Sequence, residues 1–485
     1  MKAGDLAARC GCTLRGADVE LRGVTHRAQS TAPGFVFAAL PGQRHHGSEF
    51  LAEALARGAV AVLSDRDPGP GVPWLVAANP RRALARAAWE LAGRPHERLQ
   101  MVGVTGTNGK STVCDLVACI ARAAGQQPGV FGTLGFRLPT RAEPTTHTTL
   151  EASELAPLLA ELADNGGTVA ALEVSSAGLV MERVAGLEFD VAVWTNLTRD
   201  HLDLHRDMET YFAAKARLQD LLRADPPGRR VIGVDDPFMA RLAAAPRPGD
   251  VRFGFGPDAN LTAVAIEADI LGLRFTLETP TGRAPVSMRL VGRHNLANGL
   301  AAAGVGLALD WPLEAIAAGL GQARPLPGRL EPVDVGGRRS VFVDYAHTPD
   351  ALEKVLMALR ELRPTRLIVV FGCGGDKDPG KRPLMGEIAG ALADVPIVTS
   401  DNPRSEDPSA IIDAVLVGVR RSANPHVLAI PDRREAIVAA LAMAGEGDAV
   451  LIAGKGHETE QIFADHRTPF DDREVAREAG RRRTT

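Results

Sequence analysis

The sequence of 485 residues lacks any long hydrophobic run. Nowhere do about eighteen apolar residues follow one another, which is the length that a membrane-crossing helix needs. Residues 1–20 carry charges and have no apolar segment of the kind that a secretory signal contains. We therefore expect a protein that is neither inserted in a membrane nor secreted.

Cysteine and net charge are scarce as well. The five cysteines are few for this length and odd in number, which is typical of reduced thiols in a cytoplasmic protein. The formal net charge of −4 gives no reason to expect binding to nucleic acid or to a membrane surface, and the basic tail Arg481 to Arg483 is interpreted as a solvated end. Internal repeats and low-complexity segments are also missing. These absences leave an ordinary globular protein of the cytoplasm.

Short apolar runs and helical patterns alternate along the chain. At about 100 to 200 residues per domain, the length suggests three domains, which we place at 1–94, 95–325 and 326–485. The alternation predicts an α/β fold with parallel sheets covered on both faces. The expected strands are Val60–Leu63, Trp74–Val76, Met101–Val104, Val169–Leu172, Val191–Trp194, Val341–Val343, Leu367–Phe371, Ile397–Thr399, His426–Ile430 and Ala449–Ile452. The expected helices are 50–57, 80–91, one that begins at Ser111, and Leu296–Leu309.

The segment GVTGTNGKST, residues 103–112, carries the strongest functional pattern. Backbone N–H groups from Gly106 to Lys110 can face anionic oxygens, Lys110 supplies a mobile cation, and the hydroxyl of Ser111 or Thr112 can coordinate Mg²⁺. The spacing departs from the strict Walker pattern because Val104 stands where that pattern has glycine. Taken alone, the segment predicts a phosphate-binding loop, with an ordinary turn as the alternative.

Two further polar clusters follow expected strands. Residues 173–176 follow Val169–Leu172, and residues 195–201 follow Val191–Trp194, as the phosphate loop follows Met101–Val104. In open parallel sheets, ligands bind beyond the carboxyl ends of the strands. We therefore expect all three clusters to belong to one site.

A metal ion is expected beside the phosphate loop. Glu173 and His201 are candidate ligands, and His205 follows His201 by four residues, a spacing that also suits zinc. The neighbouring Asp200 and Asp203 favour a hard ion, so Mg²⁺ is the preferred interpretation.

Lys215 interrupts an apolar stripe. Met208, Tyr211, Leu218 and Leu222 recur around it at steps of three and four residues, the spacing of one helix face. One interpretation is a lysine that extends its stem to reach water. The other is a buried amine with a lowered pKa that approaches the metal pocket and adds CO₂ to become a carbamate.

From about Gly23 to Asp472 the sequence resembles the Mur ligases, the ATP-dependent, amide-forming enzymes of peptidoglycan precursor synthesis. Beyond TGTNGKS, the resemblance is carried by eight ordered motifs: LEVSS (172–176), TNLTRDHLDLH (195–205), GRHNLANGLAA (292–302), PGRLE (327–331), DYAHTPDAL (344–352), FGCGGDKDPGKRPLMG (371–386), SDNPRSEDP (400–408) and AGKGHE (453–458). The family implies an N-terminal domain for the UDP-sugar, a central P-loop ATPase-type domain with a parallel sheet, and a Rossmann-like C-terminal domain.

Within the family, the sequence is most similar to the members that join meso-diaminopimelate to UDP-N-acetylmuramoyl-L-alanyl-D-glutamate through an acyl phosphate. The discriminating run is Asp401-Asn402-Pro403-Arg404. Diaminopimelate differs from lysine by one carboxylate, which the planar fork of Arg404 can bind through two hydrogen bonds. The alternatives are that this run is only an Asn-Pro turn, that the enzyme uses L-lysine, and that the protein closes on ATP without forming a bond.

The resemblance also implies roles for individual residues, and a monomer is expected. The catalytic group is Lys110, His201 and Lys215. ATP would contact Gly106, Thr107, Asn108, Gly109, Lys110, Ser111, Thr112, Asn295, Arg329, Asp344 and His347. One Mg²⁺ would be held by Ser111 or Thr112 and by Glu173, and a second by His201 and a CO₂-derived carbamate on Lys215. The UDP-N-acetylmuramoyl-dipeptide and diaminopimelate would contact Thr148, Thr149, Ser175, Arg183, Lys377, Asp401, Asn402, Pro403, Arg404, Gly454 and Glu458.

Four positions depart from the family pattern. Met181 stands where a polar residue is frequent, Ala177 where histidine is common, His46 where aspartate is usual, and Lys377 where the diaminopimelate enzymes often carry arginine. The last change raises the question of L-lysine as a substrate. Contacts to the UDP-sugar are expected at Gln43, Arg44 and His45.

Overall fold

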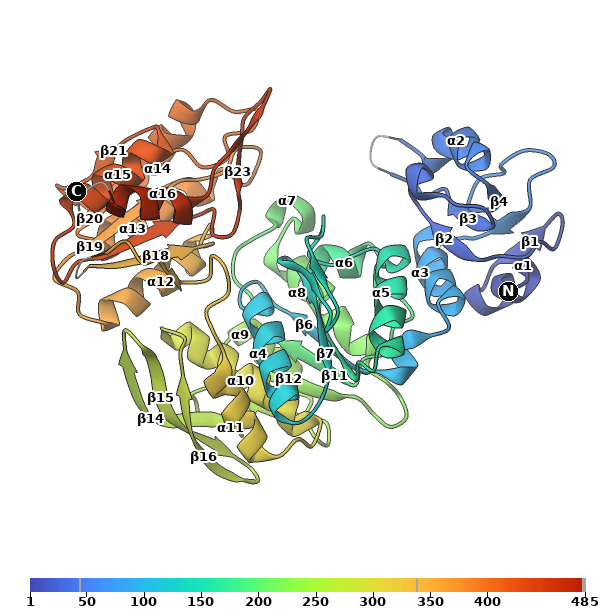
Figure 1. Ribbon diagram of the computed structural model, residues 1–485, viewed down its shortest axis with the longest axis horizontal. Coiled ribbons are helices and arrows are strands. Elements are labelled where there is room, and N and C mark those ends of the chain that lie inside the picture. The colour runs from blue at the N-terminus through green and yellow to red at the C-terminus, as the bar shows by residue number, and fades with distance from the viewer. Residues whose placement is uncertain (43–44, 337–338, 482–485) are drawn as a thin grey trace.

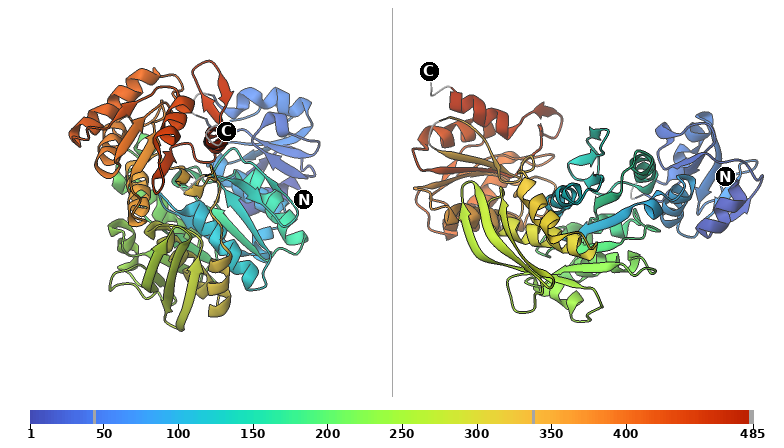
Figure 2. Two further views of the ribbon diagram at one scale, coloured as in Figure 1. Left: turned by 60° about the vertical axis from the view of Figure 1, so that its left-hand side comes forward. Right: turned by 60° about the horizontal axis from the view of Figure 1, so that its bottom comes forward.

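The computed structural model describes residues 1–42, 45–336 and 339–481. Three α/β bodies follow one another, and the N-terminal and C-terminal bodies lie on opposite sides of the middle one (Figures 1 and 2). Of the helices that the structure describes, none is both long and apolar enough to cross a membrane. The α/β class with parallel sheets expected from the sequence is confirmed.

The N-terminal body is built on a five-stranded sheet in the order β1-β5-β4-β3-β2, in which β1 alone is antiparallel to its neighbour. The strands are β1 (Thr13–Arg15), β2 (Gly23–Thr25), β3 (Phe35–Ala38), β4 (Ala59–Ser64) and β5 (Trp74–Val76), and the helices are α1 (Ala3–Cys10), α2 (Leu51–Ala56) and α3 (Pro80–Leu91). Helix α3 begins after Asn79, whose side chain accepts a hydrogen bond from the N–H of Arg82.

Helix α3 also joins the first two bodies. It packs against a helix of the middle body, α5 (Ala152–Asp164), and the indole N–H of Trp89 donates to the carbonyl of Ala185 at 2.9 Å. Buried residues of both bodies, such as Leu84 and Leu159, belong to one continuous hydrophobic cluster. The N-terminal body is therefore held by apolar packing.

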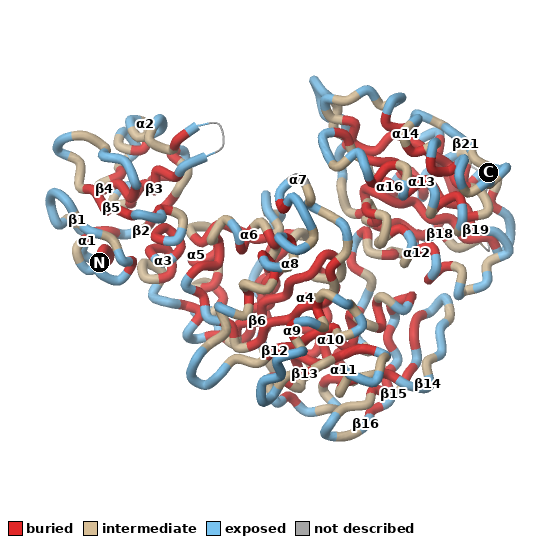
Figure 3. Tube along the Cα trace, turned by 180° about the vertical axis from the view of Figure 1, so that it is seen from behind, coloured by how far each residue is buried: buried red, intermediate tan, exposed pale blue. Residues whose placement is uncertain are grey.

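The middle body contains an eight-stranded sheet in the order β13-β12-β11-β6-β10-β7-β8-β9. Its strands are β6 (Gln100–Thr105), β7 (Pro128–Gly132), β8 (Gly135–Arg137), β9 (Ala142–Glu143), β10 (Val169–Glu173), β11 (Val191–Trp194), β12 (Arg229–Gly233) and β13 (Val251–Phe253). Its helices, besides α5, are α4 (Lys110–Ala123), α6 (Ser176–Val180), α7 (Leu202–His205), α8 (Met208–Ala216), α9 (Pro237–Ala243), α10 (Arg293–Ala308) and α11 (Leu313–Gln322). The central strands are buried on both faces, as their continuous apolar runs predict (Figure 3).

A three-stranded antiparallel sheet extends the middle body and was not expected from the sequence. It consists of β14 (Thr262–Asp269), β15 (Gly272–Thr279) and β16 (Gly282–Met288), and it packs on α10 and α11. The signal was present, because Leu273, Phe275 and Leu277 alternate with more exposed residues and are buried.

The C-terminal body has a six-stranded sheet in the order β17-β18-β22-β19-β20-β21, parallel except for β17. Its strands are β17 (Glu331–Pro332), β18 (Ser340–Asp344), β19 (Leu367–Phe371), β20 (Val395–Val398), β21 (Leu428–Ala429) and β22 (Ala449–Ala453), and a separate hairpin pairs β23 (Glu460–Ile462) with β24 (Arg467–Pro469). Its helices are α12 (Pro349–Glu361), α13 (Lys381–Leu392), α14 (Pro408–Arg421), α15 (Arg433–Met443) and α16 (Asp472–Arg481).

Two expectations from the sequence were too long. The strand expected at His426–Ile430 is reduced to the two exposed residues of β21, because it lies at the sheet edge and pairs on one side only. The helix that carries Lys215 was expected to reach Leu222, but the α-helix ends at Ala216 and continues as the 3₁₀ turn Arg217–Leu221. Leu222 nevertheless packs against the same hydrophobic cluster as Tyr211 and Leu218.

Candidate functional site

Three strand ends meet at one edge of the middle sheet. Strands β11, β6 and β10 are direct neighbours and parallel, so the loops that follow them lie side by side. The hydroxyl of Thr195 donates to the carbonyl of Asn108 at 2.7 Å, and the N–H of Asn108 donates to the side-chain oxygen of Asn196 at 3.0 Å. The segment 106–110 and the loop after β11 therefore lie against each other, as the strand order predicts.

Glycine is required at two positions of the phosphate loop. Gly106 and Gly109 have φ of +146° and +89°. A Cβ at Gly106 would lie 1.9 Å from the hydroxyl of Thr195, and one at Gly109 would lie 2.3 Å from the side-chain oxygen of Asn298. Helix α4 begins directly after Gly109, so its N-terminal N–H groups are available to an anion.

A cavity of about 490 Å³ opens beside this loop, between the middle and C-terminal bodies. Seven residues predicted to contact nucleotide line it: Asn108, Gly109, Ser111, Thr112, Asn295, Arg329 and Asp344. The expected contacts Gly106, Thr107, Lys110 and His347 are not among the lining residues, and the ring of His347 lies 4.5 Å from that of Tyr345. Sequence reasoning missed Phe253, Phe255, His294, Asp350 and Lys354, which also line the cavity. His294 and Asp350 stand inside two of the quoted motifs, whereas no motif contains the two phenylalanines.

Polar contacts hold the C-terminal body against the phosphate loop. The side-chain amide of Asn108 donates to a carboxylate oxygen of Asp350 at 2.8 Å, and a guanidinium nitrogen of Arg329 lies 3.5 Å from the hydroxyl of Ser111. Farther out, Arg199 pairs with Asp378 at 3.3 Å. The cavity is therefore completed by the C-terminal body.

Lys110 and Lys215 converge on one carbonyl oxygen. Their ammonium groups donate to the carbonyl of Gly106 at 2.9 and 2.8 Å. Lys215 is 1% exposed and its ammonium lies 4.6 Å from the ring centre of Tyr211, so the interpretation that its stem extends to water is wrong. Burial, and then the neighbouring Lys110, hold the pKa of Lys215 well below its usual range. Desolvation likewise lowers the pKa of Lys110.

Glu173 lies at the end of β10, opposite Val104 of β6. It is buried, and its carboxylate accepts hydrogen bonds from the N–H and the hydroxyl of Thr133 at 2.9 and 3.1 Å. Thr133 was not singled out from the sequence. The contacts orient the carboxylate beside the phosphate loop.

The two histidines of the expected metal region differ in environment. The side chain of His201 is 57% exposed and lies 3.4 Å from Asp200, whereas His205 is buried, stacks on Tyr211 and has its Nε2 2.9 Å from the hydroxyl of Ser176. Among the described residues, no three His, Cys, Asp or Glu side chains gather closely enough to hold a metal ion by themselves. The alternative of a zinc site on this pair is therefore unsupported. The side chain of Asp203 lies outside the described part of the chain.

Hydroxyl and guanidinium groups gather next to Glu173. The hydroxyl of Thr149 lies 2.9 Å from that of Ser175, and that of Thr148 lies 3.0 Å from Thr133. Arg183 donates to the carbonyl of Thr149 and to the carboxylate of Glu151, both at 2.9 Å. The four expected dipeptide contacts Thr148, Thr149, Ser175 and Arg183 thus belong to one network.

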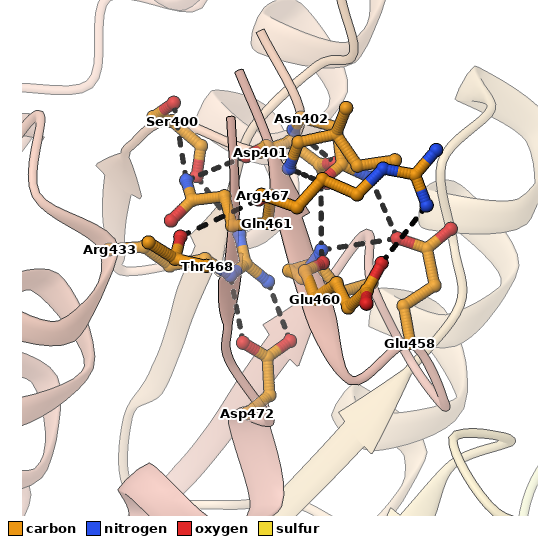
Figure 4. Close-up of polar contacts among 12 residues, drawn as sticks. Ser400, Asp401, Asn402, Arg433, Glu458, Glu460, Gln461, Arg467, Thr468 and Asp472 are labelled. Atoms are coloured by element: carbon orange, nitrogen blue, oxygen red, sulfur yellow. Dashed lines mark hydrogen bonds and ion pairs between the residues drawn. The ribbon is translucent and has the colours of Figure 1, made fainter. Parts of the chain in front are cut away.

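The expected amino-acid pocket lies at the strand ends of the C-terminal body (Figure 4). Asn402 is buried and donates to the carboxylate of Glu458 at 2.7 Å. Arg404, in the left-handed region at φ +53°, donates to the carbonyl of Gly375 at 2.8 Å and is half-buried. Gly454 abuts this loop, since a Cβ there would lie 2.4 Å from the carboxylate of Asp401.

The loop of residues 401–404 is more than an isolated Asn-Pro turn, because it also contacts β23. The N–H of Arg404, which follows Pro403, donates to the carbonyl of Ile462 at 3.0 Å. Lys377 is exposed.

The departing residues have local roles. His46 is buried and caps the 3₁₀ turn Gly47–Phe50, with its Nε2 3.0 Å from the carboxylate of Asp65. Met181 offers its sulfur to Arg183 at 3.7 Å. Ala177 lies in α6, and nothing in the structure explains its difference from histidine. His45 is exposed and pairs with Glu49 at 2.9 Å, while Gln43 and Arg44 lie outside the described residues.

Two family models match the chain: the Mur ligase middle domain over residues 104–306 and the Mur ligase, glutamate ligase domain over residues 328–456. A relative from Solibacter usitatus (strain Ellin6076), named UDP-N-acetylmuramoyl-L-alanyl-D-glutamate–2,6-diaminopimelate ligase, is 45% identical over 464 residues, which cover 95% of this chain and 94% of the relative. The chain belongs to the Mur ligase family. A relative of the same name from Gloeobacter violaceus (strain ATCC 29082 / PCC 7421) is 46% identical and covers 99% of this Mur ligase and 98% of its own length.

Solved structures agree with the family. A structure named UDP-N-acetylmuramoyl-L-alanyl-D-glutamate–2,6-diaminopimelate ligase has a TM-score of 0.70 at 33% identity, covering 100% of this chain and 99% of its own. The MurF ligase from Thermotoga maritima, solved in complex with ADP, has a TM-score of 0.65 at 19% identity and covers 89% of this chain and 93% of its own. The second comparison shows a shared fold.

Two partly buried histidines lie near the cavity: His294 lines it, whereas His347 does not. Burial, followed by the charge of Lys354, lowers the pKa of His294 to about 4. Burial, followed by the charge of Lys381, does the same for His347. Both rings are therefore neutral at pH 7.

We expect acid to destabilise the protein through these rings. An unfolded histidine binds a proton below about pH 6.5, but His294 binds one only below about pH 4. Between these values the unfolded state holds more protons, so stability falls as the pH falls and this contribution stops changing below about pH 4. Each unit of pKa shift is worth about 1.4 kcal/mol. Melting temperatures of the wild type and His294→Gln from pH 7 to 4 should converge toward low pH, whereas parallel curves would contradict the assignment.

Proposed function

We propose that this protein is the ATP-dependent ligase that adds meso-diaminopimelate to UDP-N-acetylmuramoyl-L-alanyl-D-glutamate in peptidoglycan precursor synthesis, working as a monomer in the cytoplasm. Relatives of that name are 45% and 46% identical over nearly the whole chain. The observation that carries the choice of amino acid is the loop of residues 401–404, in which Arg404 supplies a guanidinium and Asn402 donates to the carboxylate of Glu458.

The proposed reaction requires mainly that the negative charges of its reactants be neutralised. The terminal carboxylate of the dipeptide attacks the γ-phosphate of ATP, ADP leaves, and the amine of diaminopimelate then attacks the acyl phosphate and releases phosphate. Because every reactant except the amine is anionic, catalysis depends on neutralising and positioning them. The N–H groups at the start of α4 and the ammonium of Lys110 lie where the phosphates would enter, beside the cavity.

The nucleotide would lie in the cavity between the two bodies. Asn295, Arg329 and Asp344 line that cavity, and the N–H of Leu330 donates to the carboxylate of Asp344 at 2.6 Å. Arg329 lies over the ring of Tyr345 at 4.9 Å, which positions its guanidinium between the hinge and the phosphate loop. His347 would support the position of Tyr345, and through it that of Arg329, because its Nδ1 contacts the carbonyl of Tyr345.

The donor groups present fit Mg²⁺ of the kind that phosphates help to hold. Ser111 or Thr112 and the oriented carboxylate of Glu173 would hold one ion, and His201, with a carbamate on Lys215, would hold a second. Bound Mg²⁺ would neutralise the charge that builds up on the transferred phosphoryl group. The lowered pKa of Lys215 leaves a neutral amine that adds CO₂ with loss of one proton, and Lys110 beside it would stabilise the anion formed.

The dipeptide would bind across the hydroxyl network next to Glu173. Arg183 is fixed by Glu151 and by the carbonyl of Thr149, which leaves its guanidinium preorganised for a carboxylate. The hydroxyls of Thr148, Thr149 and Ser175 supply neutral hydrogen-bonding groups around it.

The reaction is tested directly by phosphate release. With ATP and Mg²⁺, we expect release only when both the UDP-dipeptide and meso-diaminopimelate are present, with a product whose mass is that of the tripeptide. The same assay with L-lysine should give little product. Release that persists without either substrate, equal turnover of lysine, or ATP that binds but is never cleaved would each contradict the proposal.

Replacement of Lys215 tests the carbamate. We expect Lys215→Ala and Lys215→Arg both to lose most activity, because neither side chain forms a carbamate. The alanine variant leaves a space that an added short carboxylate can enter, so acetate or formate should restore part of its phosphate release. The arginine variant fills that space and is the matched control that should not respond. Full activity of Lys215→Ala would exclude the role.

Replacement of Arg404 tests the recognition of the second carboxylate. Loss of a charged hydrogen-bonding partner should raise the KM for diaminopimelate about tenfold to a hundredfold, with little change in the KM for ATP. Arg467→Ala removes a guanidinium from the exposed neighbour β24 and is the matched control. An equal rise of both KM values in Arg404→Ala would indicate a general structural defect instead.

A further inference from the structure

A fully buried ammonium group lies at the proposed amino-acid pocket. The side chain of Lys455, between Gly454 and the loop that carries Glu458, is 0% exposed. Its ammonium donates to the side-chain oxygen of Asn402 at 3.0 Å, to the carboxylate of Glu458 at 3.1 Å and to the carbonyl of Glu460 at 2.5 Å. A lysine ammonium has three protons, so these contacts use all of its donors.

The first contact decides how Asn402 is oriented. Because an ammonium only donates, the oxygen of the Asn402 side chain must face Lys455, and the N–H of Ile462 donates to the same oxygen at 3.0 Å. The amide nitrogen of Asn402 is thereby directed to Glu458, 2.7 Å away. Figure 4 shows the side chains of Asn402 and Glu458 close to each other.

The second contact decides which part of Glu458 remains available. Both Asn402 and Lys455 donate to one carboxylate oxygen, Oε2. The side chain is 31% exposed, and in the described part of the chain no residue donates to the other oxygen, Oε1. One oxygen is therefore held by the protein, while the second accepts no hydrogen bond from the described residues on a side chain that is partly exposed.

A second buried cation in the same region differs in this respect. Arg433 is also 0% exposed, but its partner Asp472 is equally buried and is bound through two hydrogen bonds of 2.8 and 2.7 Å. Arg433, which Figure 4 shows beside Asp472, further donates to the carbonyls of Ala453, at the end of β22, and of Ser400, two residues after β20. The pair of Arg433 and Asp472 thus lies wholly in the protein interior and connects neighbouring strand ends. The pair of Lys455 ends on a carboxylate that is partly exposed.

We propose that Lys455 is a positioning residue for the incoming amino acid. Through Asn402 and Oε2 of Glu458 it fixes the carboxylate so that Oε1 receives the ammonium group of the zwitterionic amino acid whose distal carboxylate Arg404 binds. The inference rests on the proposed function for the identity of the amino acid. It adds that a residue with no exposed surface sets the affinity for that substrate.

Lys455→Met, which is similar in length and uncharged, tests the proposal. Loss of a buried charged hydrogen-bond donor should raise the KM for diaminopimelate about tenfold or more, while kcat at saturation and the KM for ATP change about twofold or less. Glu460→Gln is the matched control, because its carboxylate pairs with Arg467 and only its backbone carbonyl contacts Lys455. A fall in kcat together with similar rises of the KM for diaminopimelate and the KM for ATP would overturn the proposal.

A double-mutant cycle distinguishes positioning from a structural role. If Lys455 acts through Glu458, then Lys455→Met combined with Glu458→Gln should bind diaminopimelate about as weakly as the worse single variant. If the rise of the KM for diaminopimelate in the double variant equals the product of the rises in the two single variants, the proposal is overturned. If the methionine variant does not fold, Lys455→Gln, which keeps a donor for Asn402, replaces it, and failure of both to fold would assign Lys455 to the fold alone. Absence of any diaminopimelate-dependent phosphate release in the wild type would instead contradict the proposed function.

Discussion

Two ammonium groups on one backbone carbonyl form the contact on which the site depends. Lys110 and Lys215 both reach the oxygen of Gly106, although 104 residues separate them in the numbering of the chain. Two positive charges at such proximity repel each other, and after burial the neighbouring Lys110 is the second cause of the lowered pKa of Lys215. The same carbonyl thus holds two basic side chains beside the phosphate loop, close to the oriented Glu173 and the cavity.

Much of this site was predictable from the sequence, because strand order brings the motifs together. The polar clusters after β6, β10 and β11 were expected to be neighbours, and they are. The apolar runs of these strands are long and uninterrupted, so their positions were predicted within one or two residues. The Mur ligase resemblance added the C-terminal residues, such as Arg329 and Asp344, which no local pattern would have brought to the same cavity.

Other features depended on contacts that a single sequence does not display. Thr133 orients Glu173 from a different strand end, and Phe253 and Phe255 line the cavity without belonging to any motif. The helix of Lys215 ends early because it tightens into a 3₁₀ turn, which periodicity alone does not reveal. The antiparallel sheet β14–β16 was detectable from its alternation but was overlooked among the longer helical patterns.

The hydrophobic cluster shared by the first two bodies has a mechanical meaning. Residues from Leu6 to Leu242 belong to one apolar interior, whereas the C-terminal body meets the phosphate loop through polar pairs such as Asn108 with Asp350. Separating the first two bodies would expose apolar side chains to water. Moving the C-terminal body away would only replace a few of its hydrogen bonds with hydrogen bonds to water. The first two bodies should thus move as one rigid unit, whereas the C-terminal body can change its position relative to them.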